Sequence, residues 1–256
     1  MSIARRDDRP RAGGIPARSW LSLPPILAGV ALFSAVSAGM APAKALRPTA
    51  VKPTQQVVSL FSPHKAYLEP STRSTKLALI PAKRPITDQR TVLPVLGHRT
   101  GNGHRWFLVR LPGRPNGRTG WITRRATVTW RTPWHVVVDT STRRVSVYRR
   151  GRGIREFKAV VGRFFTPTPV GDFFVEESIR LSPRAVGAPF ALALSARSTV
   201  YQEFAGGPGQ IALHGLKNVG GRPGTAVSHG CVRLDTAAMK WLVRRIGPGV
   251  PVTITR

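Results

Sequence analysis

The sequence predicts a mainly β protein, in which a small β domain precedes a second β domain with one short helix near its C-terminus. Short apolar runs alternate with turn-forming residues from about residue 56 onward, as is typical of β barrels and sandwiches. Only one late stretch, 236–246, has the apolar spacing of an amphipathic helix. The chain has 256 residues, which is enough for two modest domains.

Changes in composition divide the chain into four parts. Residues 1–45 are predicted to be an export signal or membrane anchor, and 46–55, rich in Pro, Thr and Lys, a linker. Residues 56–130 are predicted to form the first β domain, and 131–256 the second. No internal repeat is evident.

The N-terminal part has the layout of an export signal. Residues 1–18 are polar and basic, whereas 19–43 contain no charged residue, and 41–43 and 43–45 have the small-x-small form that signal peptidase accepts. An uncleaved membrane anchor stays open, because 19–43 approaches the roughly 20 residues that span a bilayer. A buried helix of a globular domain is a third interpretation. We expect export to the cell envelope, with membrane contact only through 19–43 if this part is uncleaved.

The charge of the chain is strongly unbalanced, with 40 Lys and Arg against 11 Asp and Glu and a net charge of +29. Nucleic acid, anionic lipid and an anionic wall polymer are the partner classes that such a charge fits. Export and the lack of a nucleic-acid recognition motif argue against a nucleic-acid binder, so we expect anionic cell-wall polymers and no nucleic acid as partners. A single cysteine excludes an internal disulfide bond.

Five apolar stretches in the first domain are predicted strands: Val57–Phe61, Leu77–Ile80, Val92–Leu96, Trp106–Leu111 and Trp121–Val128. Asn116-Gly117 predicts a tight hairpin turn that brings Trp106 and Trp121 together. We interpret both tryptophans as core residues rather than a ligand platform. The stretch resembles the bacterial SH3-like modules found beside wall enzymes.

In the second domain, the predicted strands are Val136–Asp139, Arg144–Tyr148, Phe157–Val161, Asp172–Glu176, Phe190–Leu194, Ile211–Leu213 and Val250–Ile254. The first two are expected to pair as a hairpin. Asp235 is a candidate N-cap for a helix over Thr236–Ile246. Thr166–Gly171 is either a simple loop or a wall of a substrate groove.

The candidate chemistry lies in the glycine-rich stretch 214–233, which holds the only cysteine, Cys231, with His214 and His229. A thiol attacks as the thiolate and needs a base within hydrogen-bond reach. His214, at the end of an apolar strand, is the candidate base. No acidic residue lies between positions 203 and 235, so a main-chain carbonyl is the candidate group that orients its imidazole.

The residues around Cys231 predict the rest of a site. Ser228, His229 and Gly230 are small or flexible enough to line it, and their amides are candidates for an oxyanion hole. In an extended strand His229, Cys231 and Arg233 share one face, which offers Arg233 to a substrate carboxylate.

Two other interpretations of this stretch stay open. Cys231 is an inert core cysteine in the first, and forms a zinc site with His214 and His229 in the second. The remaining histidines, His64, His98, His104 and His135, are interpreted as solvated or structural.

Residues 134–255 resemble the L,D-transpeptidase catalytic domain (YkuD-like). The resemblance is carried by Pro167–Gly171, by His214-Gly215 and by the segment Ser228–Arg233, with His214 seventeen positions before Cys231. It implies a β-sandwich catalytic domain that needs no cofactor and no metal. It also implies that carbapenems acylate the thiol.

The resemblance further implies peptidoglycan cross-linking. Cys231 would attack a tetrapeptide stem, release D-alanine and pass the acyl group from a thioester to a neighbouring stem, which forms a 3→3 cross-link. His214 would be the general acid and base, oriented by the Gly215 carbonyl, and Arg233 would contact substrate. Tyr201 is a candidate lid tyrosine. A wall cysteine peptidase and a catalytically silent wall-binding protein are the alternatives.

Overall fold

The computed structural model describes residues 51–101, 103–203 and 206–256. The chain divides into the units Met1–Arg47 and Pro48–Arg256, and all described residues belong to the second unit. The predicted export segment lies outside the described residues, as does the first half of the predicted linker. None of the helices in the described part of the chain has the length and apolar character needed to cross a membrane.

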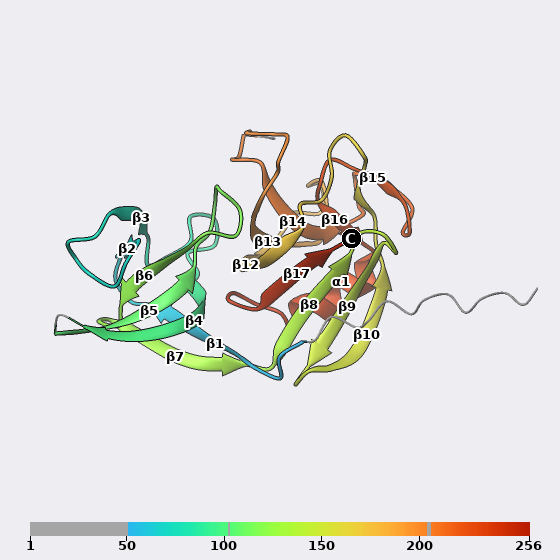
Figure 1. The fold of residues 1–256 in the computed structure, drawn as a ribbon. Helices are drawn as coiled ribbons and strands as arrows, with labels where there is room; N and C mark the ends of the chain where they lie inside the picture. Colours follow the sequence, from blue (N-terminus) through green and yellow to red (C-terminus); the bar gives the residue numbers. More distant parts are fainter. Residues whose placement is uncertain (1–50, 102, 204–205) are drawn as a thin grey trace, which may run out of the picture. The chain divides into compact units, whose positions relative to one another are not determined.

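Residues 51–132, here called the N-terminal lobe, form one seven-stranded antiparallel sheet (Figure 1). Its strands are β1 (Gln55–Leu60), β2 (His64–Tyr67), β3 (Lys76–Ile80), β4 (Val92–Gly101), β5 (His104–Arg110), β6 (Thr119–Thr123) and β7 (Thr127–Thr132). The strand order is β3-β2-β6-β5-β4-β1-β7. Alternate apolar side chains form the core of this lobe, where Val58, Leu93 and Val109 have no exposed surface.

The strands of this lobe differ from the prediction in three respects. The single strand predicted over Trp121–Val128 is wrong, because the chain turns at Ala126, whose φ is 51°, and divides into β6 and β7. The strand β2 was not predicted, and β1 begins at Gln55, inside the predicted linker.

The hairpin predicted around Asn116-Gly117 is confirmed, because β5 and β6 pair antiparallel, but the connection between them is longer than a two-residue turn. Residues 111–118 join β5 to β6, and of the predicted pair only Gly117 has a positive φ, 79°. Asn116 instead reaches the backbone of Arg197, 81 positions away, with both its side-chain oxygen and its nitrogen. A tertiary contact therefore replaces the local turn chemistry that the dipeptide indicates.

Trp106 is a core residue, as predicted, with 1% of its surface exposed and its ring edge-on to Tyr67 at 5.9 Å. Trp121 is half-buried and faces Leu108 across the β5–β6 pair. The resemblance of this lobe to SH3-like modules stays a prediction.

Residues 133–256, the C-terminal lobe, are built on an eight-stranded sheet. Its elements are β8 (Trp134–Asp139), β9 (Arg144–Arg149), β10 (Arg152–Lys158), β11 (Val161–Gly162), β12 (Gly171–Arg180), β13 (Phe190–Arg197), β14 (Gln210–Gly215), β15 (Ala226–Ser228), β16 (Val232–Leu234), α1 (Thr236–Val243) and β17 (Pro251–Thr255). The order in the sheet is β10-β9-β8-β17-β12-β13-β14-β16. The pairs β8–β17 and β14–β16 are parallel and the other pairs antiparallel, whereas β11 and β15 form a separate parallel pair.

The mainly β fold with one short helix is confirmed. Asp235 caps α1 as predicted, because its side-chain oxygen accepts a 2.7 Å hydrogen bond from the Ala238 amide. Such a cap stabilises a helix by about 1 kcal/mol. The helix ends at Val243, three residues before the predicted end, although Ile246 is still buried in the core.

The two lobes are joined by more than their short connection at Pro133. Phe174 of β12, only 1% exposed, packs into the core of the N-terminal lobe. Glu176 and Glu177 of the same strand are buried and form ion pairs with Arg84 of the N-terminal lobe. The strand β12 therefore belongs to the C-terminal sheet by its hydrogen bonds and to both lobes by its side chains.

Candidate active site

The topology brings together the two halves of the glycine-rich stretch. β14 and β16 are parallel neighbours, with His214 opposite Arg233, and Cys231 directly precedes β16 (Figure 1). Ile211 and Leu213 point into the core, so His214 points to the opposite face of β14. Residues that are seventeen positions apart thereby face the same space.

That space is a cavity of about 420 Å3. It is lined by Val186, Ser198, Tyr201, Gly209, Gln210, Ile211, His214, Val219, Val227, His229, Cys231 and Arg233. Of the residues predicted for the site, it brings together His214, His229, Cys231 and Arg233.

The ring of His214 is held in one tautomer. Its Nδ1 lies 2.8 Å from the carbonyl oxygen of Gly215. A carbonyl only accepts hydrogen bonds, so Nδ1 carries the proton and donates, which leaves the Nε2 lone pair free to act as a base. Burial lowers the pKa of His214, opposed by the Gly215 hydrogen bond and reinforced by the charge of Arg233. The imidazole is therefore neutral at physiological pH.

Cys231 rests as a thiol. Burial raises the pKa of this half-buried side chain, whereas a backbone hydrogen bond with Ala212 and the charge of Arg233 lower it. The Sγ atom lies 4.0 Å from the carbonyl oxygen of Gln210. Because burial is the largest of these effects, the thiol needs a base to become a nucleophile at neutral pH.

Ser228 is buried and does not line the cavity. It has no exposed surface, its hydroxyl donates to the Cys231 carbonyl at 2.6 Å, and it accepts from the Gly230 amide at 3.1 Å. The Gly230 φ is 117°, and a Cβ there would meet the side chain of Ile211 at 3.0 Å. Ser228 and Gly230 therefore shape the turn that presents Cys231.

Two buried threonines of the stretch Thr166–Gly171 form hydrogen bonds with the backbone near this turn. Thr166 is buried and its hydroxyl donates to the Ser228 carbonyl at 3.1 Å. Thr168, also buried, accepts from the Gly162 amide at 2.9 Å. None of the residues in this stretch that the structure describes lines the cavity.

Arg233 is a buried cation at one wall, with 8% of its surface exposed. Its Nη1 donates to the carbonyls of Gly220 (3.2 Å) and Val219 (3.4 Å), and its Nε is buried without a hydrogen-bond partner. Burial lowers the pKa of Arg233, and Cys231 raises it. The Nε–H group of Arg233 is thus a hydrogen-bond donor that has no partner within the described residues.

His229 and Tyr201 line the cavity together. His229 is exposed, and its ring centroid lies 6.0 Å from that of Tyr201. Within the described part of the chain, no three His, Cys, Asp or Glu side chains are grouped as the ligands of a metal ion would be.

Gly187 is a site residue that the sequence did not indicate. Its φ is 82°, and a Cβ at this position would overlap the ring of His214, at 2.9 Å from Cγ. Its carbonyl also accepts from the Gly215 amide at 2.8 Å. Only the folded chain shows this packing, because Gly187 lies 27 positions before His214.

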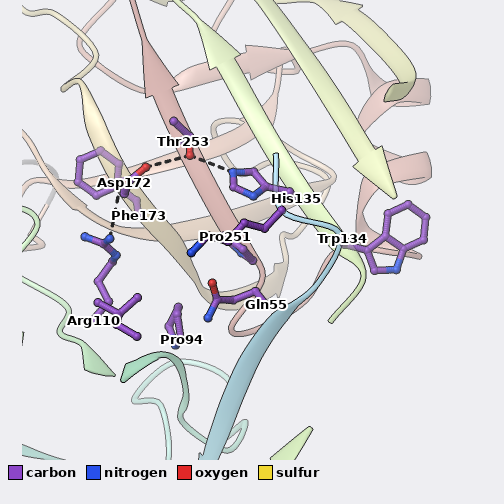
Figure 2. Close-up of a pocket in the computed structure, with 11 residues that line it drawn as sticks. Gln55, Pro94, Arg110, Trp134, His135, Asp172, Phe173, Pro251 and Thr253 are labelled. Atoms are coloured by element: carbon purple, nitrogen blue, oxygen red, sulfur yellow. Dashed lines mark hydrogen bonds and ion pairs between the residues drawn. The ribbon is translucent and has the colours of Figure 1, made fainter. Parts of the chain in front are cut away.

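A second cavity, of about 250 Å3, lies between the lobes and shares no lining residue with the first (Figure 2). His135 Nε2 lies 2.9 Å from the Thr253 hydroxyl, which donates to Asp172 at 3.0 Å, and Asp172 is 3.5 Å from an Arg110 nitrogen. This chain of polar contacts contains no thiol and gives His135 a structural hydrogen bond.

Known proteins are similar in sequence to part of this chain. Residues 133–254 match the family model of YkuD, the L,D-transpeptidase catalytic domain. The YkuD proteins of Bacillus subtilis (strain 168) and Bacillus licheniformis, whose names place them with the L,D-transpeptidases, are 28% and 29% identical over 125 and 124 residues. The aligned region covers 48% of this chain and 67% and 66% of those proteins. The aligned region thus spans about two thirds of the length of these two relatives.

Among solved structures, L,D-transpeptidase 3 from Mycobacterium tuberculosis, in complex with a faropenem-derived adduct, is 15% identical. The alignment covers 64% of this chain and 91% of that chain, with a TM-score of 0.42. Residues 133–254, which make up most of the C-terminal lobe, are therefore similar to the YkuD L,D-transpeptidase catalytic domain.

Proposed function

We propose that this protein is a peptidoglycan L,D-transpeptidase that works through a thioester on Cys231. The observation that carries the proposal is the pairing, in one cavity, of a lone thiol with an imidazole held as a base by the Gly215 carbonyl. A carbonyl in place of an acid fixes the tautomer without adding charge. His214 thus stays able to take a proton, as a cysteine nucleophile of raised pKa requires.

In the proposed first half-reaction, Cys231 Sγ attacks the carbonyl carbon that joins the third residue of a tetrapeptide stem to its terminal D-alanine. His214 Nε2 takes the thiol proton and then gives it to the nitrogen of the departing D-alanine. The C–N bond breaks and the thioester remains. The Gly230 amide already donates to Ser228, so the Cys231 amide is the better candidate among these for binding the oxyanion.

In the second half-reaction, the side-chain amine of a neighbouring stem attacks the thioester. His214 accepts a proton from this amine and returns it to the sulfur as the 3→3 amide bond forms. The free Nε of Arg233 and its positive charge support a role in holding a substrate carboxylate or carbonyl. His229 and Tyr201 would line the path by which the stems enter.

The C-terminal lobe also carries a basic segment, residues 143–158, that supports anionic wall polymers as partners and the envelope as location. Residues 143–158 include these seven cations: Arg143, Arg144, Arg149, Arg150, Arg152, Arg155 and Lys158. Glu156 is the one acid among them. Arg155 lies 5.5 Å from the ring centroids of both Phe157 and Trp241, and Arg245 lies 4.4 Å from that of Trp241. Stacking on rings holds these guanidinium groups in place for phosphate or carboxylate groups.

Sedimentation with purified cell wall tests this partner. We expect Arg149→Ser/Arg155→Ser to weaken binding and to make it less sensitive to salt. The exposed pair Arg124→Ser/Arg125→Ser, in the N-terminal lobe, removes the same charge and is the control. Equal losses in the two variants, or equal binding of the wild type to DNA, would contradict a wall-specific role for this basic segment.

The proposed function is tested by intact-mass spectrometry of the chain incubated with imipenem. We expect one adduct on the wild type, none on Cys231→Ala and slow formation on His214→Ala. Muropeptide analysis then identifies the product with and without an acceptor stem. Hydrolysis despite an acceptor would instead favour the cysteine peptidase, and an unmodified wild type would favour a silent wall-binding protein.

A further inference from the structure

We propose that Arg114 of the N-terminal lobe is a positioning residue for the Cys231 cavity. Its guanidinium donates hydrogen bonds to the backbone of the connection between β13 and β14, which supplies part of the cavity wall. We call this set of hydrogen bonds the clasp. The inference rests on the function proposed above for its effect on the reaction. The clasp itself rests only on the geometry of the described residues.

The contacts of Arg114 are all with main-chain carbonyls of the C-terminal lobe. Nη1 donates to Pro208 at 2.9 Å, whereas Nη2 donates to Tyr201 at 2.7 Å and to Ser198 at 3.1 Å. One rigid, planar group thereby holds both ends of the connection. A guanidinium suits this task, since its five N–H donors have a fixed geometry and never lose their charge.

The segment around Arg114 is aligned with the end of β13 by two further contacts. The Gly113 amide donates to the Ser195 carbonyl at 3.3 Å. Asn116 accepts from the Arg197 amide and donates to the Arg197 carbonyl, both at 2.8 Å. Residues 113–116 therefore follow the backbone of β13 and deliver the arginine to the point where that strand ends.

The connection held by Arg114 closes on itself at the same place. The Ser198 amide donates to the Gly209 carbonyl at 2.7 Å, and the Ser198 hydroxyl accepts from the amides of Val200 (3.2 Å) and Tyr201 (3.0 Å). Gly209 has a φ of 62°, and a Cβ there would overlap the Tyr201 carbonyl and lie 3.0 Å from Arg114 Nη2. A side chain at Gly209 is thus incompatible with the clasp.

The residues at these contacts are also cavity residues. Ser198, Tyr201 and Gly209 line the Cys231 cavity, and the adjacent Gln210 places its carbonyl 4.0 Å from the thiol. Without Arg114, three carbonyls lose a charged donor, and the part of the cavity wall that contains Ser198 and Tyr201 loses its fixed position. The N-terminal lobe is therefore part of the machinery that shapes the substrate site.

Acylation by imipenem of the full chain tests the inference. We expect Arg114→Ala to lower the second-order rate constant about tenfold, mainly through a higher half-saturating concentration, because the wall positions the ligand. Arg114→Lys keeps the positive charge but not the planar set of N–H donors. Its rate constant should therefore lie between those of Arg114→Ala and the wild type. Gln89→Ala is the matched control: Gln89 also binds the C-terminal lobe through backbone, at Ser178, but away from the cavity.

Three further tests separate positioning from damage to the nucleophile or the fold. The rate at which iodoacetamide alkylates Cys231 should change less than twofold in Arg114→Ala, because this small reagent does not depend on the cavity wall for its position. Gly209→Ala should lower the rate constant of acylation by imipenem as much as Arg114→Ala does. The double variant should lower it little further, because both substitutions break the same clasp. Hydrogen exchange at the amides of Val200 and Tyr201 should be faster in Arg114→Ala than in Gln89→Ala.

Arg114→Ala that acylates as fast as Gln89→Ala would overturn the inference. So would an equal loss of reactivity towards imipenem and iodoacetamide, or additive losses in the double variant. A wild type that imipenem does not acylate would overturn the transpeptidase function instead, and the exchange rates at Val200 and Tyr201 would then decide the clasp alone.

Discussion

Replacing Glu176 by glutamine tests how the two lobes hold each other. The Glu176 carboxylate has no exposed surface and faces Arg84 of the N-terminal lobe and, at 3.0 Å, Arg197 of β13. These two arginine side chains are only 10% and 9% exposed. Burial lowers the pKa of Arg197 to about 10, so this guanidinium is poorly hydrated and depends on its partner.

Glutamine keeps the shape of Glu176 but removes the charge that two buried cations share. Breaking a buried ion pair by removing one partner costs about 3–5 kcal/mol. For a unit of this size, that corresponds to a decrease in Tm of roughly 6–20 °C. Glu177 stays in place and pairs with Arg84 at 3.6 Å, so we expect the lower half of this range.

Urea and thermal unfolding of the full chain, followed by circular dichroism, measure this effect. Asp172→Asn is the matched control, because its carboxylate is 60% exposed and its ion pair with Arg110, at 3.5 Å, also joins the lobes. An exposed pair contributes about 0–1 kcal/mol. If Glu176→Gln and Asp172→Asn have equal effects on the free energy of unfolding, burial does not govern these ion pairs and the reasoning is refuted.

Three further predictions concern the site and the fold. Because burial lowers the His214 pKa, acylation of Cys231 should be constant from pH 8 down to about 6.5 and fall only below the ordinary histidine value; a rate that already halves at pH 7 would contradict this. In Gly187→Ala the new Cβ displaces the His214 ring, so the acylation rate should fall by about 100-fold while circular dichroism stays unchanged; a wild-type rate would mean that the ring does not need this packing. Asp235→Ala removes the cap of α1 and should lower the free energy of unfolding by about 1 kcal/mol in urea titrations, whereas Asp235→Asn, which keeps an acceptor, should lose less.

The nucleophile and its base could be predicted because their signals are local. A lone cysteine two positions after a histidine, and a histidine that ends an apolar strand, are properties of short segments. The parallel pairing of β14 with β16 then brings these segments together. Most of the longer strands of the C-terminal lobe were predictable for the same reason, since alternation along a strand follows which face is buried. The strand predicted over Phe157–Val161 is wrong, because β10 ends at Lys158 and β11 begins at Val161. The almost fully exposed β10 and the short strands β11, β15 and β16 show too little alternation to be predicted.

The residues that shape the site were not predictable in this way. Ser228 next to the thiol looks like a lining residue, yet Thr166, 62 positions away, binds its carbonyl within a buried turn. Asn116-Gly117 has the composition of a tight turn, but contact with Arg197 in the other lobe outweighs that local preference. Long-range contacts of this kind leave no periodic trace in the sequence.

The position of Phe174 has a consequence for folding. This side chain belongs to a strand of the C-terminal sheet but completes the core of the N-terminal lobe. Neither lobe can close its core before the other supplies or accepts this ring. A cut at Pro133 would leave one fragment with a hole and the other with an exposed phenylalanine. The lobes should therefore unfold in a single cooperative transition, although the sequence pattern describes them as two domains.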